Sequence, residues 1–338
     1  MGEMMRKLSR NNMISVFILF IIISVVGIFI IKAYNSDANS NKSYNLILIP
    51  KAVDESNGFW PALIEGARLG SEEYGANLEV MGAATEEDVD GQIESVKKAI
   101  ALEPDAILIA ASDVTRITPS LKEAVEAGIE VVLVDSLIDD DSIGSCVVAT
   151  DNVLAGKELG EYTKRLLDED SQVAMVGHVH GTSTATEREK GMREGLGEFE
   201  KNVVEVVYAG SSYDRAYEST IKLLEKYPEL DVIMGMNEYS SVGIARAIDE
   251  LELSKKVKVV GFDNSLEEIQ LLEKGVFEAI IIQKTVNMGY LGVEQTIRVL
   301  NGEKVEAYTD SGCKLITRGN MYIDENQRLL YPFSAGQQ

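Results

Sequence analysis

The sequence is poor in the side chains on which most enzymes and metal sites depend. Its 338 residues include only two histidines, two cysteines and one tryptophan. Cys146 and Cys313 are too far apart for a C-x-x-C zinc or redox motif, and His178 and His180 stand almost together. G-x-S-x-G, H-E-x-x-H and P-loop motifs are missing as well. We therefore expect no catalytic residue, no metal and no cofactor.

Positive charge is also scarce, with 32 Lys and Arg against 55 Asp and Glu, a net charge of −23. Nucleic acid is bound through clustered cations, so this balance excludes it as a partner. Residues 1–32 are the exception, with four cations and one acid, whereas the rest has 28 cations and 54 acids, a net −26. A basic N-terminal segment followed by an acidic body indicates association with a membrane.

One long apolar run, Met13–Ile31, supports that reading, because its 19 residues contain no charge. As a helix it would span about 28 Å, close to the ~30 Å hydrocarbon core of a bilayer. Arg6, Lys7 and Arg10 precede it, which places residues 1–12 in the cytoplasm and the body outside the cell membrane. Polar residues follow in the stretch 32–43, which we interpret as a linker.

A cleaved signal peptide is the alternative to this signal anchor. Its apolar core would usually have 7–15 residues and end at an A-x-A-like site. The run here is longer, and Lys32-Ala33-Tyr34-Asn35 offers no such site. No cysteine lies near it, which excludes a lipoprotein anchor, so we favour an uncleaved single-pass anchor.

From Tyr44 onward, short apolar runs alternate with amphipathic stretches. Continuous apolar runs of this kind are typical of parallel strands that helices cover on both faces. The strands are expected at 46–49, 78–81, 106–109, 131–134, 146–148, 173–176, 203–207, 232–234, 257–260 and 279–282, and the helices near 61–74, 86–101, 115–127, 184–199, 214–226, 239–250, 265–273 and 286–300. This pattern predicts an α/β protein with two successive doubly wound parallel sheets and no linker between them.

Polar and aromatic residues follow many of the predicted strands, where open parallel sheets bind their ligands. They comprise two carboxylates, three amides, one arginine and three aromatics: Asn57, Phe59, Trp60, Asp135, Arg188, Tyr213, Asn237, Asp263 and Gln283. Such a set suits an uncharged polyhydroxylated molecule, because hydroxyls pair with carboxylates, amides and arginine while rings cover C–H faces. The alternative is that Asp and Asn at strand ends only cap helices.

Two weaker signals stay open. His178 and His180 offer two imidazoles, but no third ligand is identifiable and a metal site needs three or four, so we interpret them as loop or cleft-rim residues. Cys146 and Cys313 would pair in an oxidising exterior, where a disulfide would restrain a hinge, although free thiols are favoured.

Taken together, the chain resembles the type I periplasmic binding proteins, in their ribose/galactose-binding branch. The resemblance covers about Tyr44 to Arg318. It rests on the order and spacing of six short motifs: Ser56-Asn57-Gly58-Phe59-Trp60, Asp151-Asn152, Gly181-Thr182-Ser183…Glu187-Arg188, Tyr213-Asp214-Arg215, Gly261-Phe262-Asp263 and Asn301-Gly302-Glu303.

The resemblance implies roles for the nine residues and a division of the chain. Asn57, Asp135, Arg188, Asn237, Asp263 and Gln283 would hydrogen-bond the ligand, and Phe59, Trp60 and Tyr213 would wall it. Three crossings would join an N-terminal lobe, residues 44–150 plus 284–312, to a C-terminal lobe, residues 151–283 plus 313–338. Ser136 stands where ribose binders have arginine, so ribose itself is not assumed.

The implied function is capture of a small sugar or polyol by hinge closure and its presentation to an ABC-type importer. We expect an extracytoplasmic monomer, held to the cell membrane by residues 13–31. The alternative is a receptor subunit that presents its closed state to a sensor kinase or chemoreceptor; an enzyme acting on sugars is disfavoured.

Overall fold

The computed structural model describes residues 43–332, of which residues 44–332 belong to one compact unit, Tyr44–Gln338. The predicted segments 1–12 and 13–31, and the linker up to residue 42, lie outside the described residues. Among residues 43–332, no helix combines the length and the apolar character that crossing a membrane requires.

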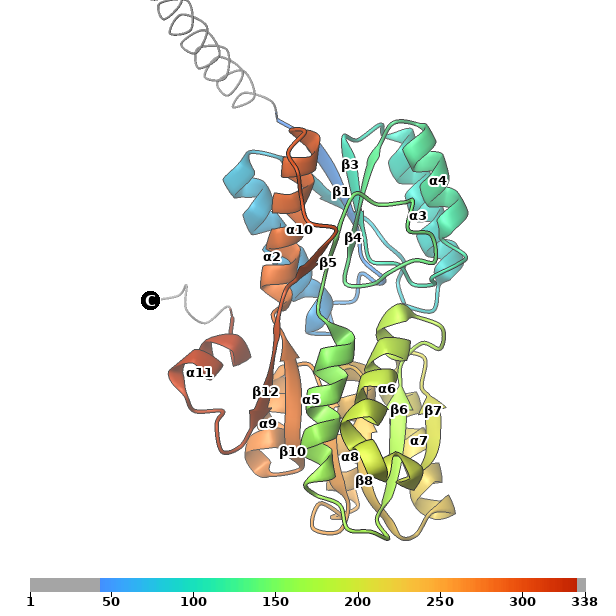
Figure 1. Ribbon diagram of the computed structural model, residues 1–338, viewed down its shortest axis with the longest axis vertical. Helices are drawn as coiled ribbons and strands as arrows, with labels where there is room; N and C mark the ends of the chain where they lie inside the picture. The colour runs from blue at the N-terminus through green and yellow to red at the C-terminus, as the bar shows by residue number, and fades with distance from the viewer. Residues whose placement is uncertain (1–42, 333–338) are drawn as a thin grey trace, which may run out of the picture. The chain divides into compact units, whose positions relative to one another are not determined.

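The first lobe is built on a six-stranded parallel sheet (Figure 1). Its strands, in spatial order, are β11 (Tyr308–Asp310), β5 (Val147–Ala149), β4 (Glu130–Val134), β3 (Ala106–Ile109), β1 (Asn45–Ile49) and β2 (Asn77–Val80). Helices α2 (Phe59–Tyr74) and α10 (Thr285–Leu300) cover one face, and α3 (Val89–Ala101) and α4 (Thr118–Glu126) cover the other. The buried strand residues Ile107, Leu108 and Ile109 are fully enclosed, as a sheet covered on both faces requires.

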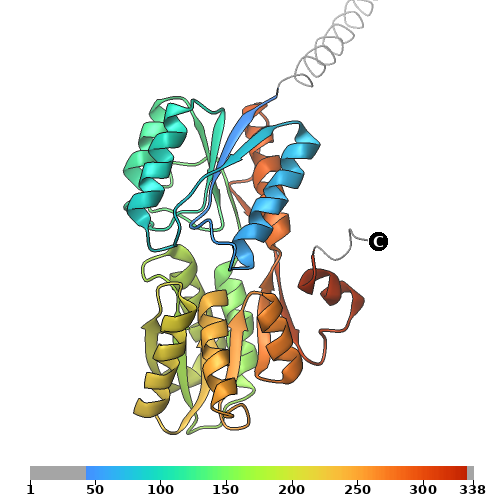
Figure 2. The same cartoon turned by 180° about the vertical axis from the view of Figure 1, so that it is seen from behind.

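The second lobe repeats this design with one antiparallel edge strand. Its strand order is β12 (Cys313–Thr317), β10 (Phe277–Gln283), β9 (Lys258–Phe262), β8 (Leu230–Gly235), β6 (Gln172–Gly177) and β7 (Val203–Tyr208), with β12 antiparallel to β10. One face is covered by α7 (Tyr213–Lys226), α8 (Glu238–Glu250) and α9 (Leu266–Lys274), the other by α5 (Asn152–Lys164) and α6 (Ser183–Leu196). A 3₁₀ helix, Gly197–Asn202, follows α6, and α11 (Asp324–Leu330) lies near the C-terminus (Figure 2). The prediction of two doubly wound lobes is thus confirmed.

The chain passes between the lobes three times: after β5, after β10 and between β11 and β12. Hydrogen bonds tie these crossings together, from the backbone N–H of Lys284 to the carbonyl of Gly312 and from that of Ser311 to the carbonyl of Ala149. The hydroxyls of Thr150 and Ser311 lie 3.3 Å apart. The three crossings therefore form one connected strip of backbone.

Close packing of α2 against α10 sets the position of the loop that precedes α2 in the first lobe. A Cβ atom on Gly289 would lie 2.0 Å from the carbonyl oxygen of Leu63, and one on Gly66 would lie 2.0 Å from that of Val286. Only glycine fits at such distances. The N-terminus of α2, where Asn57 and Trp60 lie, is thereby held beside the crossing that leads into α10.

Candidate functional site

Twelve side chains from both lobes surround one small cavity where the strands of the two sheets end. Eight of the nine residues expected from the sequence are among them; the lining is Lys51, Asn57, Phe59, Trp60, Glu86, Asp135, His178, Thr184, Arg188, Asn237, Asp263 and Gln283. The cavity measures about 20 Å³, room for roughly one water molecule. The ninth expected residue, Tyr213, lies outside this lining.

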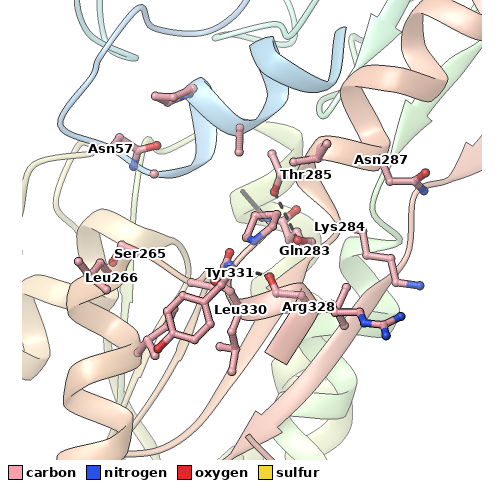
Figure 3. A pocket seen from close by; sticks show the side chains of 18 of the residues that line it. Asn57, Ser265, Leu266, Gln283, Lys284, Thr285, Asn287, Arg328, Leu330 and Tyr331 are labelled. Atoms are coloured by element: carbon pink, nitrogen blue, oxygen red, sulfur yellow. Dashed lines mark hydrogen bonds between the residues drawn. The ribbon is translucent and has the colours of Figure 1, made fainter. Parts of the chain in front are cut away.

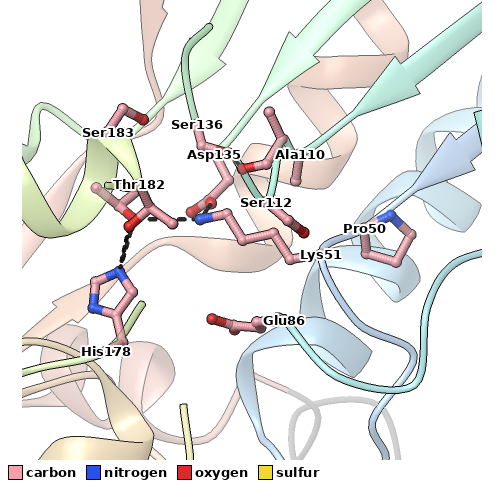
Figure 4. A network of polar contacts seen from close by, with 12 residues as sticks. Pro50, Lys51, Glu86, Ala110, Ser112, Asp135, Ser136, His178, Thr182 and Ser183 are labelled. Atoms are coloured by element: carbon pink, nitrogen blue, oxygen red, sulfur yellow. Dashed lines mark hydrogen bonds and ion pairs between the residues drawn. The ribbon is translucent and has the colours of Figure 1, made fainter. Parts of the chain in front are cut away.

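Lys51, which sequence reasoning missed, reaches into the middle of the site (Figure 4). Its ammonium nitrogen lies 2.7 Å from Oδ2 of Asp135, and both side chains are buried. The same nitrogen lies 3.3 Å from the hydroxyl of Thr184 in the other lobe and 5.9 Å from the centre of the Trp60 ring. Lys51 thus connects the two lobes across the cavity.

Glu86 is a second buried charge that the sequence analysis did not identify. Its carboxylate accepts hydrogen bonds from Nε1 of Trp60 at 2.9 Å and from the hydroxyl of Ser211 in the second lobe at 2.5 Å. Burial raises the pKa of Glu86, an effect that the nearby Lys51 ammonium opposes. The bond from Trp60 fixes the plane of the indole ring at the edge of the cavity.

Asp263 organises the second lobe's side of the site. Its carboxylate accepts from the backbone N–H of Glu238 at 2.8 Å and from Nε2 of Gln283 at 2.6 Å. Burial raises the pKa of Asp263, whereas the Arg188 guanidinium lowers it. Asp263 and Asp135 have φ angles of 82° and 63°, in the left-handed region that few non-glycine residues adopt. Such backbone strain at both carboxylates is typical of a functional site.

Arg188 is held rigidly at the base of the cavity. Its Nε donates to Oδ1 of Asn152 at 2.8 Å, one terminal nitrogen donates to the carbonyl of Met236 at 2.7 Å, and the guanidinium lies 4.4 Å from the centre of the Phe262 ring. These contacts fix its orientation before any ligand arrives.

Two buried polar atoms at the cavity have no hydrogen-bond partner within the described residues: Nδ1 of His178 and Oε1 of Gln283. Burial, together with the charges of Arg188 and Lys51, holds the pKa of His178 well below its ordinary value, so the imidazole is neutral. Its Nε2 lies 2.9 Å from the hydroxyl of Thr184. Unpaired buried polar atoms are costly, so a further hydrogen-bond partner is expected for each.

Asn57 and Asn237 bear out part of the capping alternative. Oδ1 of Asn57 accepts from the backbone N–H groups of Phe59 and Trp60, and Oδ1 of Asn237 accepts from that of Ser240 in a capping box. Both asparagines nevertheless line the cavity. Capping therefore uses the Oδ1 atoms and fixes the orientation of both side chains beside the cavity. Their Nδ2 groups take no part in the capping bonds.

Tyr213 belongs to a seam of hydrogen bonds that joins the lobes beside the cavity. Its hydroxyl donates to Glu238 at 2.6 Å and lies 3.3 Å from the carbonyl oxygen of Ser56. The Glu238 carboxylate also accepts from the backbone N–H of Gly58, at 2.8 and 3.0 Å, and Tyr239 donates to Asp54 at 2.6 Å. The contacts with Ser56, Gly58 and Asp54 cross from one lobe to the other, so the structure is a closed arrangement.

Glu238, which accepts hydrogen bonds from Tyr213 and Gly58 in this seam, is a titratable group. Burial, followed by the nearby Asp263 carboxylate, raises its pKa from 4.5 to about 7, against the bonds from Tyr213 and Gly58, which lower it. Burial, followed by the Glu238 and Asp263 carboxylates, also raises the pKa of Glu268 well above its ordinary value. At these two carboxyl groups the folded protein therefore binds more protons than the unfolded chain between about pH 4.5 and 7.

We expect these two groups to lower the free energy of unfolding as the pH rises through that range, with Glu238 contributing at most about 3 kcal/mol. Glu238→Gln, which cannot ionise, should flatten the fall, as measured by urea unfolding at pH 5 and pH 7.5. Glu250→Gln, at the other end of α8, is the matched control. Equal pH dependence in wild type and Glu238→Gln would contradict this assignment.

The structure also places the two histidines and the two cysteines that the sequence left open. His178 lines the cavity, whereas the ring of His180 packs edge-on against Tyr208 at 4.9 Å. Within residues 43–332 no group of three or more His, Cys, Asp or Glu side chains could hold a metal ion. Cys146 and Cys313 are both free thiols.

Comparison with known proteins identifies the class. A model of the periplasmic binding protein domain matches residues 48–304. The chain is 27% identical to the ribose import binding protein of Escherichia coli over 281 residues, covering 83% of this chain and 93% of that protein. It is 25% identical to the D-ribose/D-allose-binding protein of Pseudomonas aeruginosa over 280 residues, covering 81% of this chain and 87% of that protein.

Solved structures agree with this assignment. A sugar transporter from Clostridium phytofermentans is 41% identical with a TM-score of 0.78, covering 81% of this chain and 99% of that one. A solute-binding protein from Agrobacterium vitis with bound D-fucose is 28% identical with a TM-score of 0.80, covering 85% and 100%.

The chain therefore belongs to the periplasmic binding protein family, as predicted from its motifs. Members of this family are substrate-binding proteins and not enzymes, and their binding domain is extracytoplasmic. The relatives named above do not favour the alternative of a sensory receptor.

Proposed function

We propose that this protein captures a small neutral sugar or sugar-like molecule outside the cytoplasm and delivers it to an ABC-type importer. The observation that carries the proposal is the small cavity between the lobes, where carboxylates, amides, an arginine and two aromatic rings face one another and two buried polar atoms lack partners. The relatives' names and titles mention ribose, allose or fucose, which supports a monosaccharide as the ligand.

The proposed ligand residues are the nine expected from the sequence, of which Tyr213 acts from the seam. Lys51, Glu86, His178 and Thr184 join them because they line the same cavity. Phe59 and Trp60, whose ring centres lie 4.9 Å apart at an interplanar angle of 84°, would cover the sugar's C–H face.

Ligand entry requires movement, because about 20 Å³ is far below the ~300 Å³ at which ligand pockets begin. We propose that residues 44–150 plus 284–312 and residues 151–283 plus 313–338 separate as rigid bodies about the three crossings. Separation would break the seam at Glu238 and Tyr239 and withdraw Lys51 from Thr184. Closure over a sugar would then restore the seam and create the surface that the importer recognises.

Charge in the site favours a neutral ligand. Two cations, Lys51 and Arg188, face three carboxyl groups, those of Glu86, Asp135 and Asp263. An anionic sugar would add to the side already in excess, within a buried region where unpaired charge is costly.

Thermal unfolding of residues 44–338, the compact unit, against pentoses, hexoses and polyols tests the proposal. At 100 times its dissociation constant, a true ligand should add about 2.7 kcal/mol of stability and raise the unfolding temperature by several degrees. Galacturonate and ribose 5-phosphate are matched anionic controls and should give smaller shifts than galactose and ribose. Absence of a shift with every neutral compound would refute sugar binding.

We further propose that residues 13–31 are an uncleaved signal anchor that keeps the protein on the outer face of the cell membrane. Support comes from the charge-free run of 19 residues and the preceding cations. The full chain should sediment with membranes and resist extraction by carbonate, whereas residues 44–338 should stay in solution. Release of a shortened protein into the medium would instead indicate cleavage.

A further inference from the structure

A larger pocket lies next to the ligand cavity, at the crossings that join the lobes. It measures about 950 Å³, is lined in part by Gln283, Lys284 and Thr285, and shares Asn57 and Gln283 with the ligand cavity. We call it the hinge pocket. Its volume lies at the upper end of the range for small-molecule sites, roughly 300–1,000 Å³.

Apolar side chains from both lobes form its walls. Leu69 of α2 belongs to the first lobe and Leu266 of α9 to the second, and their exposed fractions are 46% and 62%. Ile269, Val286, Leu329 and Tyr331 add further apolar area. On so acidic a protein, large exposed apolar side chains gathered in one hollow indicate a binding surface.

The pocket also has a cationic side. Lys284 and Arg328 line it, are exposed, and take part in no ion pair or side-chain hydrogen bond among residues 43–332. Figure 3 shows both on the same side of the pocket, with Ser265 and Leu266 on the opposite side. Glu55 is the single acid among the lining residues. The hollow is therefore apolar along its walls and positive along one edge.

We propose that the hinge pocket binds a second ligand, an organic anion with an extended apolar body. The anionic group would pair with Lys284 and Arg328, and the apolar body would lie between Leu69 and Leu266. The cations and the apolar walls are independent features of the pocket, and a sugar would suit neither.

Such a ligand would regulate the sugar site. Because the walls come from both lobes and from the crossings, the width of the pocket depends on the angle between the lobes. A ligand that prefers one angle shifts the lobe equilibrium and changes sugar affinity, and sugar changes its affinity by the same factor. This coupling rests on the proposed function, whereas binding to the pocket does not.

Binding can be measured without sugar, on residues 44–338, with the fluorescent anion 8-anilinonaphthalene-1-sulfonate. Decanoate below its micellar concentration should displace the dye, and decyltrimethylammonium, of equal chain length, should do so about tenfold less well or worse. Equal displacement by both surfactants would overturn the role of the cations.

The variant Lys284→Glu/Arg328→Glu should bind the dye about tenfold more weakly or worse. Lys97→Glu/Lys98→Glu, two exposed positions on α3 of the first lobe, is the matched control and should bind it as wild type does. Leu266→Ser should lower the affinity for the dye without changing the preference for decanoate over decyltrimethylammonium. Unchanged binding in the first variant would refute the proposal. Dye binding that occurs only after residues 333–338 are removed would also refute the proposal, because those residues would then be the occupant of the pocket.

Discussion

Replacing Asp263 with asparagine is expected to abolish sugar binding while the protein stays folded. Both carboxylate oxygens accept hydrogen bonds from N–H donors, those of Glu238 and Gln283, and the group faces the Arg188 charge. Asparagine would turn an NH₂ group toward one of these donors and remove the negative charge near Arg188. A hydrogen bond from a sugar hydroxyl to a charged carboxylate contributes about 1.5–3 kcal/mol, so the loss of two such bonds should raise the sugar's dissociation constant by at least about 100-fold.

Isothermal titration with the best sugar from the panel measures this loss, and circular dichroism checks the fold. Asparagine tolerates the left-handed backbone at this position, where φ is 82°, so the substitution adds little strain. Asp249→Asn is the matched control, because Asp249 lies on α8 of the same lobe and pairs at the surface with Lys274. An affinity for sugar unchanged in Asp263→Asn would show that the ligand lies elsewhere.

The course of the chain could be predicted because buried parallel strands are continuous apolar runs. The strand expected at 106–109 has those bounds in the structure, and most others differ by one or two residues. β11, β12 and α11 were not predicted. β11 and β12 lie at sheet edges, and several of their side chains reach solvent, so their sequences lack the apolar run that marked the others.

The residues that line the cavity could be predicted in part because strand ends of a parallel sheet meet at one edge. That rule placed Asp135, Asp263 and Gln283, and applied to β6 it would also have placed His178, which directly follows Gly177. Glu86 does not directly follow a strand, and the donors to its buried carboxylate, Trp60 and Ser211, are distant in the sequence. The seam through Glu238 depends on the angle between the lobes, which local sequence does not specify.

The ion pair of Lys51 and Asp135 gives the second large expected effect, on stability. Lys51→Met would remove the ammonium from a site where Lys51 is 3% and Asp135 4% exposed, leaving a carboxylate without its partner. Breaking a buried pair in this way costs about 3–5 kcal/mol. The free energy of unfolding, measured with urea at pH 7, should fall by that amount.

The double variant Lys51→Met/Asp135→Asn separates the buried charge from the lost lysine contacts. With neither charge present, most of the stability should return, because the penalty in the single variant comes from the isolated carboxylate. Lys122→Met is the matched control: Lys122 pairs with Asp140 at the same 2.7 Å, but its side chain is 52% exposed, and surface pairs contribute about 0–1 kcal/mol. If Lys51→Met were no more destabilising than Lys122→Met, the pair would not be buried in solution, and the closed arrangement would not be the dominant state of the free protein. If the double variant were as unstable as the single one, Lys51 would act through its contacts with Trp60 and Thr184 rather than through its charge.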